Sequence, residues 1–396
     1  MLRIHFLMLF LRCGWVDCVG AAENASWTAV VCDSAKPYRG PELHRPLGRR
    51  ILAEAGKPFG LGLESNTVLR LEKAFEQALH IARAPSMTAA VGVPGRGIWS
   101  ATRNQSSETE PVPEAFWFAS VGKAFTAAVV LQCVEEGRLS LNDRVIRWFQ
   151  EYPNATAITI DHLLSHTSGI YSFQNDPGMQ ERLGYHSPEE LIEIARAHGN
   201  GFCPGEYWSY SNTGYVMLGR IIEQLEGRPF HEVLTLRLIQ RLGLKHTRAL
   251  VPRGEMIGVA RPHPSTSQGR GAEGSVPTTP YAAGDVVSTA ADMVEFWHAL
   301  LGGKILKPET VRDQFQRLYP MFDRGTYYGK GVMLYDVPDK DGKRLIWLGH
   351  SGGAPGSKAM VAYSVDAHAF VAVALNNDGS AEAVANLLLK ALSSKP

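Results

Sequence analysis

Ser120 and Lys123 belong to Ser120-Val121-Gly122-Lys123, the only Ser-x-x-Lys of the chain, which opens an apolar helical pattern. Residues at i and i+3 share one face of a helix, so the lysine amine can meet the serine hydroxyl. A serine hydroxyl is a poor nucleophile until a neighbouring base activates it. The spacing predicts acyl transfer, with Ser120 as nucleophile and Lys123 as its base. The alternative is a helix N-cap serine followed by an exposed lysine, and only further motifs can decide between the two.

A second polar group is Tyr210-Ser211-Asn212, which stands between Pro204-Gly205 and a helical pattern. A loop tip before a helix can direct its side chains into a cleft. Tyr210 can relay protons if nearby cations lower its pKa, and Asn212 can bind both a substrate carbonyl and a lysine. Tyr152-Pro153-Asn154 has the same pattern, but its proline between two helical patterns predicts a plain turn.

A third group is His350-Ser351-Gly352, which follows an apolar strand pattern over residues 345–348. His350 and Ser351 would line a substrate cleft there. Gly352 and Gly353 would let the backbone approach closely and present an amide to an oxyanion. Lys340-Asp341-Gly342 is a rival for this motif, but Asp-Gly between two strands predicts a hairpin.

Two other patterns suggest different chemistry. Gly349 to Gly353 matches the Gly-x-Ser-x-Gly nucleophile elbow, which would make Ser351 the nucleophile. That elbow needs a helix directly after it and a later acid and histidine, whereas Ala354-Pro355-Gly356 and a strand pattern follow here. His162 and His166 have the spacing of two zinc ligands, but the glutamate of the zinc-protease pattern is missing. We therefore predict neither a metal site nor a cofactor.

The elements that must position these groups differ in type along the chain. Hydrophobic periodicity and cap residues predict helices over residues 66–82, 120–136, 161–166, 188–198, 213–226, 231–241, 290–301 and 381–392. Alternating or β-branched runs predict strands over residues 87–93, 98–101, 331–337, 344–348, 359–364 and 369–375. Strands at both ends with helices between them predict an α+β fold, with an antiparallel sheet flanked by helices and an inserted, mainly helical domain.

These patterns also set the expected domain bounds. Residues 1–22 are a candidate signal peptide, and residues 23–60 are expected to form an irregular arm. Residues 61–137 and 284–396 would form the α/β sheet domain. Residues 138–283 would form the inserted helical domain, and the site would lie between the two.

The three motifs in this order resemble the penicillin-recognising serine hydrolases, the superfamily of β-lactamases and DD-peptidases. Tyr-x-Asn as second motif is similar to class C β-lactamases, serine DD-carboxypeptidases and family VIII esterases, and departs from the Ser-Asp-Asn of class A enzymes. The flanking residues 118–119, 136–143, 163–169 and 204–205 are also similar to this family. The resemblance covers about residues 65–392 and implies the DD-peptidase/β-lactamase fold.

The resemblance also implies roles for individual residues. Ser120 would be acylated, and Lys123 and Tyr210 would be the base and proton-relay pair, with the identity of the acylation base left open. Asn212 would hold the substrate amide. His350, Ser351 and Gly352 would line the cleft as substrate-binding residues, and the backbone N–H groups of Ser120 and Gly353 would form the oxyanion hole.

His350 stands where class C β-lactamases have lysine, and histidine is mostly neutral above its ordinary pKa of about 6.5. This difference favours amide or peptide substrates over esters and disfavours efficient β-lactam hydrolysis. The resemblance therefore implies a serine hydrolase acting on an amide, peptide or ester carbonyl. Two alternatives are a carboxylesterase of the β-lactamase-like family and a sensor that binds β-lactam or peptidoglycan without turnover.

Composition limits the partners of the chain. Its 396 residues carry 40 basic and 39 acidic side chains, a net charge of +1 without a basic run, so we expect no nucleic acid partner. No apolar run after the first residues reaches the roughly 18 residues of a membrane span. The five cysteines show neither a disulfide framework nor a zinc pattern. We expect a small-molecule or peptide substrate and export to the periplasm or medium, while a cytoplasmic location and the oligomeric state stay open.

Overall fold

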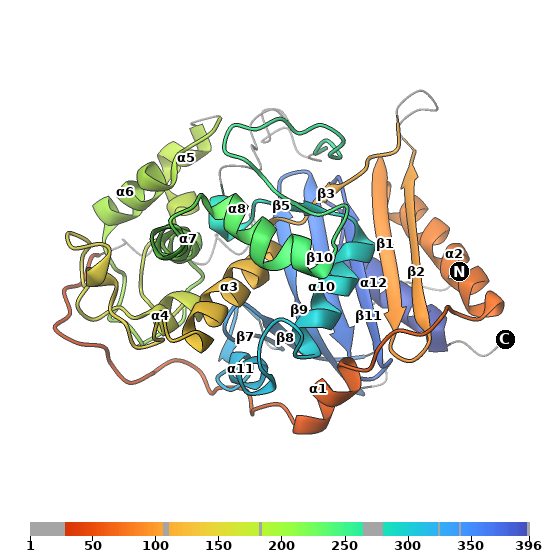
Figure 1. Ribbon diagram of the computed structural model, residues 1–396, viewed down its shortest axis with the longest axis horizontal. Coiled ribbons are helices and arrows are strands. Elements are labelled where there is room, and N and C mark those ends of the chain that lie inside the picture. The colour runs from red at the N-terminus through yellow and green to blue at the C-terminus, as the bar shows by residue number, and fades with distance from the viewer. Residues whose placement is uncertain are drawn as a thin grey trace.

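Strands from the two ends of the chain meet in one antiparallel sheet. The structure is a computed structural model that describes residues 28–105, 111–181, 184–263, 280–323, 325–339 and 342–393. The eight strands of this sheet follow the order β2-β1-β11-β10-β9-β8-β7-β6 (Figure 1). Their bounds are β1 Ser86–Val93, β2 Gly97–Asn104, β6 Tyr319–Pro320, β7 Thr326–Tyr328, β8 Met333–Pro338, β9 Arg344–Ala354, β10 Ser357–Ser364 and β11 Ala369–Leu375. The predicted antiparallel sheet flanked by helices is confirmed.

Burial along the central strands follows from helices on both faces of the sheet. β11 is buried at every position, and β1 at all but its last, whereas the edge strand β2 alternates between buried and more exposed residues. α2 (Ser65–Ala82) and α12 (Ala381–Ser393) cover one face, and α10 (Ala290–Leu301) and α3 (Lys123–Glu135) lie on the other (Figure 1). A strand that is covered on both faces favours a continuous apolar run, which β11 has, while β1 is apolar or glycine apart from the small polar residues Ser86 and Thr88.

α3 is the central helix between the sheet and the helical part. It is buried on all sides from Lys123 to Cys133, which its uniformly apolar sequence permits. The ring of Phe125 stacks on Phe296 of α10, with centroids 3.6 Å apart and an interplanar angle of 7°. After the helix, Gly137 has a φ of 70°, the left-handed conformation that glycine adopts most readily.

The residues between α3 and β5 are mainly helical and lie to one side of the sheet (Figure 1). They form α4 (Ile160–Leu164), α5 (Pro177–Glu181), α6 (Pro188–His198), α7 (Asn212–Glu226), α8 (Phe230–Leu234) and α9 (Gln240–Leu242). The single helix predicted over residues 231–241 is interrupted by a π-helical turn at Thr235–Ile239. A small sheet of β3 (Phe116–Trp117), β5 (Val286–Ser288) and β4 (Arg248–Ala249), which the sequence did not predict, joins this part to the start of α3.

Among the described residues, three α-helices lie outside the predicted ones: α1 (Arg49–Ala55), within the expected irregular arm, α5, and α11 (Pro308–Gln314). The candidate signal peptide lies outside the described residues, as does most of the loop between Arg253 and Pro280. In the described part of the chain, no helix combines the length and apolar character needed to span a bilayer.

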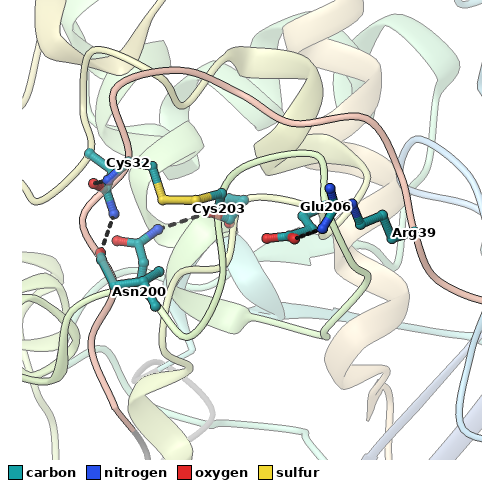
Figure 2. The surroundings of a disulfide bond; sticks show 8 residues. Cys32, Arg39, Asn200, Cys203 and Glu206 are labelled. Atoms are coloured by element: carbon teal, nitrogen blue, oxygen red, sulfur yellow. Dashed lines mark hydrogen bonds and ion pairs between the residues drawn. A yellow bond between two sulfur atoms is a disulfide. The ribbon is translucent and has the colours of Figure 1, made fainter.

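The arm before α1 is tied covalently to the helical part. Cys32 forms a disulfide with Cys203, 171 residues further along the chain (Figure 2). Backbone bonds continue the attachment: Lys36 N–H donates to the carbonyl of Pro204 and Arg39 N–H to that of Glu206, both at 2.8 Å. The cysteine pattern did not predict this pair, because two lone cysteines so far apart in sequence give no information about their distance in space.

Candidate active site

Ser120 lies in a short 3-10 turn, Ala119–Gly122, that leads directly into α3. The residue before it, Ala119, has a φ of 46°, a left-handed conformation that is costly for a residue with a Cβ atom. This turn places Ser120 against strand β9, where its side chain is 7% exposed. Backbone strain of this kind is found at functional sites, where the surrounding structure holds it in place.

Lys123 is the first residue of α3, and solvent does not reach its side chain. Its Nζ donates a hydrogen bond to the carbonyl of Ala283 at 2.6 Å and lies 3.1 Å from the Oγ of Ser120. Burial lowers the pKa of Lys123 well below its usual value. A neutral amine has one lone pair, and here that lone pair is within reach of the serine hydroxyl.

Tyr210 contributes a buried phenol beside this pair. The Nζ of Lys123 lies 4.9 Å from the centroid of its ring. Burial raises the pKa of Tyr210, and the nearby Ser120 opposes only part of the rise. The hydroxyl has no hydrogen bond of ordinary geometry to the described residues. Tyr210 is therefore a neutral phenol with a free proton, and the cation-lowered pKa considered from the sequence is not found.

Asn212 is the first residue of α7, and its side chain is 7% exposed. Its Nδ2 donates to the Oε1 of Gln174, and its backbone N–H donates to the Oγ of Ser172 at 3.0 Å. The Oδ1 atom is buried and has no partner among the described residues. Asn212 thus holds an unused acceptor in the site. Gln174 was not predicted, because it lies in a 3-10 turn of three residues, Phe173–Asn175, that leaves no recognisable pattern.

His350 on β9 is completely buried and sits at the end of a chain of hydrogen bonds. Its Nδ1 lies 2.6 Å from the carbonyl oxygen of Ser351, which can only accept, so Nδ1 carries the proton. Its Nε2 then accepts from the hydroxyl of Tyr328 at 3.2 Å. Burial, followed by the proximity of Lys123, lowers the pKa of His350 to about 3. The imidazole is neutral and is shielded from solvent in this structure.

The residues after His350 form the part of β9 that lies against the 3-10 turn Ala119–Gly122, which carries Ser120. β8 pairs with β9 only as far as Gly349, so residues 350–354 have a free side there. A Cβ atom added to Gly352 would lie 3.0 Å from the backbone nitrogen of Ser120. Glycine therefore leaves the N–H of Ser120 uncovered. The hydroxyl of Ser351 lies 3.7 Å from the sulfur of Met333.

The other patterns that the sequence offered for these roles do not fill them among the described residues. Asn154 joins the arm, since its Oδ1 accepts from Cys32 N–H at 2.7 Å and its Nδ2 donates to the carbonyl of Val30. β9 runs as a strand from Arg344 through Ala354 and no helix follows, so the nucleophile elbow at Ser351 is excluded. Lys340 and Asp341 lie outside the described residues.

The histidine pair does not form a metal site. The Nδ1 of His162 accepts from the backbone N–H of Thr159 and closes a helix-capping box. His166 lies beyond the end of α4 and faces Tyr210. Within the ranges that the structure describes, no group of three or more His, Cys, Asp or Glu side chains could hold a metal ion.

Comparisons with known proteins define the class. The fold is that of the penicillin-recognising serine hydrolase superfamily. The Beta-lactamase family model matches residues 71–394, and the chain belongs to the β-lactamase family. This confirms the resemblance that the three motifs suggested.

The names of the similar proteins describe different activities. Penicillin-binding protein 4* of Bacillus subtilis (strain 168) is 27% identical over 296 residues, which are 70% of this chain and 63% of that protein. Esterase EstB of Burkholderia gladioli is 30% identical over 197 residues, 44% of this chain and 50% of that protein. The structure of a D-stereospecific amidohydrolase from Streptomyces sp. is 28% identical with a TM-score of 0.66 and covers 79% of this chain and 96% of that one. The chain thus spans less than two thirds of the length of the two curated relatives.

Proposed function

We propose that this chain hydrolyses an amide, peptide or ester bond through a covalent acyl-enzyme on Ser120. The observation that supports this most directly is a fully buried lysine whose Nζ lies 3.1 Å from the serine Oγ. Because burial lowers the pKa of Lys123 well below its usual value, the neutral amine is favoured, and its lone pair can accept the serine proton. Lys123 is then the base of acylation.

The first half-reaction starts when the Oγ of Ser120 attacks the carbonyl carbon and its proton moves to the Nζ of Lys123. The resulting ammonium lies 4.9 and 5.5 Å from the ring centroids of Tyr210 and Tyr215, which stabilise a buried cation. The neutral phenol of Tyr210 gives its proton to the leaving amine or alcohol as the carbonyl carbon releases it. Lys123 then returns a proton to Tyr210.

The second half-reaction reverses these roles with water as the nucleophile. Water adds to the acyl carbon and loses a proton to Lys123. The Oγ of Ser120 then leaves the carbon and takes a proton from Lys123. In both halves the oxyanion is held by the backbone N–H groups of Ser120 and Gly353, of which the first is left uncovered by Gly352. Asn212 offers its unpartnered Oδ1 to an N–H of the substrate.

His350 and Ser351 complete the substrate side of the site. A neutral, hydrogen-bonded His350 supplies no positive charge for a substrate carboxylate, and its Nδ1–H instead fixes the carbonyl of Ser351 on the free edge of β9. We therefore favour neutral amides and esters over β-lactams. The names of the relatives, an esterase and a D-stereospecific amidohydrolase, agree with this choice.

A substrate panel tests the proposal. D-amino acid amides, D-Ala-D-Ala peptides, a chromogenic cephalosporin and p-nitrophenyl esters are assayed with the wild type and Ser120→Ala, and intact mass spectrometry follows a fluorescent penicillin. We expect turnover of an amide or ester that Ser120→Ala abolishes. Normal turnover in Ser120→Ala contradicts the proposal, and a stable penicillin adduct without turnover of any substrate supports the sensor instead.

We also propose that the chain is exported. A disulfide between Cys32 and Cys203 supports this, because such bonds persist in oxidising compartments and are rare in the cytosol. Expression of the full chain in a Gram-negative host, followed by fractionation and thiol labelling, tests it. Protein found in the cytoplasmic fraction with both thiols reduced contradicts export.

A further inference from the structure

His166 lies behind Tyr210, where the chain turns after α4. The side chain is 1% exposed, and the backbone φ is 59°. A left-handed conformation costs a residue with a Cβ atom about 1 kcal/mol or more, so it persists only where neighbouring contacts hold it. This conformation directs the imidazole toward the segment that carries Tyr210.

Two hydrogen bonds join His166 to that segment on both sides of Tyr210. The N–H of Ser209 donates to the carbonyl of His166 at 3.0 Å. The N–H of Ser211 donates to the Nδ1 of His166 at 3.2 Å. The backbone of Tyr210 is thus held immediately before and immediately after the residue.

These bonds define the tautomer of His166. Because Nδ1 accepts, the proton of the neutral imidazole is on Nε2. Burial, followed by the proximity of Lys123, lowers the pKa of His166 well below its usual value, so the ring stays neutral. The Nε2 atom is buried without a partner among the described residues, an arrangement that costs stability.

The imidazole also packs on the ring of Tyr210. The two ring centroids are 4.2 Å apart with an interplanar angle of 37°, and the ring of Tyr328 lies 4.5 Å from His166. Since the hydroxyl of Tyr210 has no hydrogen bond of ordinary geometry to the described residues, its contact with Ser120 does little to fix the ring. Its orientation depends on packing and on the backbone on either side.

We propose that His166 is a positioning residue that holds Tyr210 beside Ser120 and Lys123 through the Ser211 N–H···Nδ1 bond and through ring packing. This inference rests on the proposed function, in which Tyr210 hands its proton to the leaving group. A phenol displaced by about 1 Å would bind substrate as before but would protonate the leaving group more slowly.

Two substitutions separate the hydrogen bond from the bulk of the side chain. His166→Asn places Oδ1 near the position of Nδ1, and asparagine tolerates the left-handed conformation. His166→Phe keeps a ring but loses the acceptor. We expect His166→Phe to lower kcat by about 10- to 100-fold with KM changed less than about threefold, and His166→Asn to recover most of kcat. Should His166→Phe not fold, His166→Gln replaces it, because its longer side chain carries no acceptor at the Nδ1 position.

His162 offers a matched control. Its Nδ1 also accepts a backbone N–H, from Thr159 at 3.1 Å, so His162→Phe loses the same kind of bond at the other end of α4. We expect this variant to lose stability while kcat stays within about twofold of the wild type. A loss of kcat equal to that of His166→Phe would show a general effect of destabilising α4 and would overturn the inference.

Hydrogen exchange at the Ser211 amide gives a readout that does not depend on turnover. Exchange should be faster in His166→Phe and close to wild type in His166→Asn. The inference is overturned if His166→Phe keeps its kcat, or if His166→Asn is as impaired as His166→Phe. If the wild type shows no Ser120-dependent turnover, the proposed function fails, and unchanged exchange in His166→Phe then also overturns the positioning of Tyr210.

Discussion

The Nζ of Lys123 lies 3.1 Å from the Oγ of Ser120, in a side chain that solvent does not reach. Its amine donates to the carbonyl of Ala283 and lies 5.5 Å from the ring centroid of Tyr215 on α7. An ammonium in that position would lose its hydration without gaining a carboxylate partner, so the neutral amine is favoured. The same burial that costs stability favours the neutral amine that the proposed reaction needs as its base.

The first prediction concerns pH. Only the unprotonated Lys123 can accept the serine proton, and its pKa lies well below the ordinary value. We therefore expect kcat/KM for a neutral substrate to fall only on the acid side, with the fall centred well below the ordinary lysine pKa of about 10.4. A pH–rate profile measures this. A rate that still climbs through about pH 10 would mean an ordinary lysine pKa.

We predict that activity requires glycine at position 352, because this residue has no side chain. In Gly352→Ala the added Cβ would clash with the backbone carbonyl oxygen of Phe118 and lie 3.0 Å from the backbone nitrogen of Ser120, so β9 would have to move away from the donor that faces the oxyanion. We expect kcat to fall by about 100-fold or more. Gly62→Ala is the control, because a Cβ there meets nothing within 4 Å. Steady-state kinetics on folded variants would refute the assignment if both behaved alike.

The disulfide of the arm is predicted to stabilise the fold. Closing a separation of 171 residues restricts the unfolded chain, and such bonds typically contribute about 2–4 kcal/mol. Thermal unfolding of Cys32→Ser/Cys203→Ser should show a lower Tm than the wild type. Adding a reductant should lower the wild-type Tm toward that of the double variant and leave the variant unchanged. A reductant effect of equal size in both proteins would contradict this.

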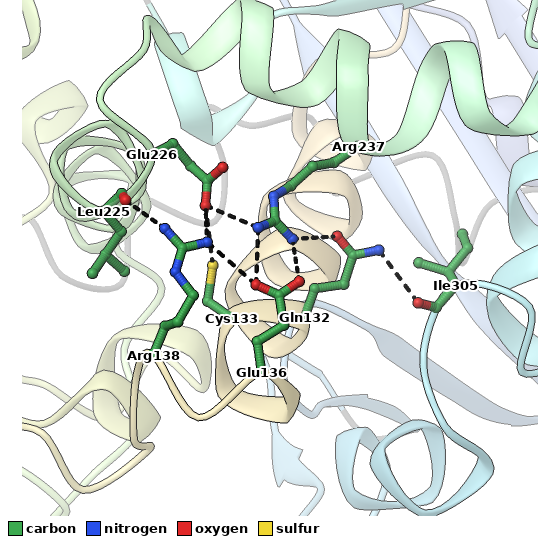
Figure 3. A network of polar contacts seen from close by, with 8 residues as sticks. All are labelled: Gln132, Cys133, Glu136, Arg138, Leu225, Glu226, Arg237 and Ile305. Atoms are coloured by element: carbon green, nitrogen blue, oxygen red, sulfur yellow. Dashed lines mark hydrogen bonds and ion pairs between the residues drawn. The ribbon is translucent and has the colours of Figure 1, made fainter.

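Arg237 is predicted to hold three helical segments together. Its guanidinium donates to Glu136 at 2.7 and 2.9 Å and to Glu226 at 2.9 Å, and it joins the ends of α3 and α7 to the π-helical turn (Figure 3). Because the group is only 18% exposed, removing it leaves the partly buried carboxylate of Glu226 and the more exposed one of Glu136 with fewer partners. Arg237→Met should lower the free energy of unfolding in urea by roughly 2 kcal/mol.

The control for the Arg237 variant is a variant of a solvent-exposed ion pair. Arg312 contacts Glu309 with both side chains well exposed, so Arg312→Met should cost at most about 0.5 kcal/mol. Equal losses in the two variants would show that the buried network has no special contribution. The free thiol of Cys133 lies beside this network, where burial raises its pKa to about 11.

Local patterns allowed much of the fold to be predicted. β11 is apolar throughout and β1 is mostly so, because helices cover both faces of these strands, and such runs are visible in the sequence. The helix over Pro188–His198 has a serine cap and a glutamate three residues later, so both of its ends were predicted correctly. The short strands β3 and β4 were missed, since two paired residues leave no periodic pattern.

The candidate site divides in the same way. The sequence alone determined which reactive groups are present: a Ser-x-x-Lys on a helix, a Tyr-x-Asn before a helix, and glycines after His350 that permit close approach of the backbone. Only the tertiary structure decided the charge states of Lys123 and His350, the pairing of Cys32 with Cys203, and the contact of His166 with Tyr210. Those properties depend on desolvation and on distances between segments far apart in sequence, which spacing along the chain does not record.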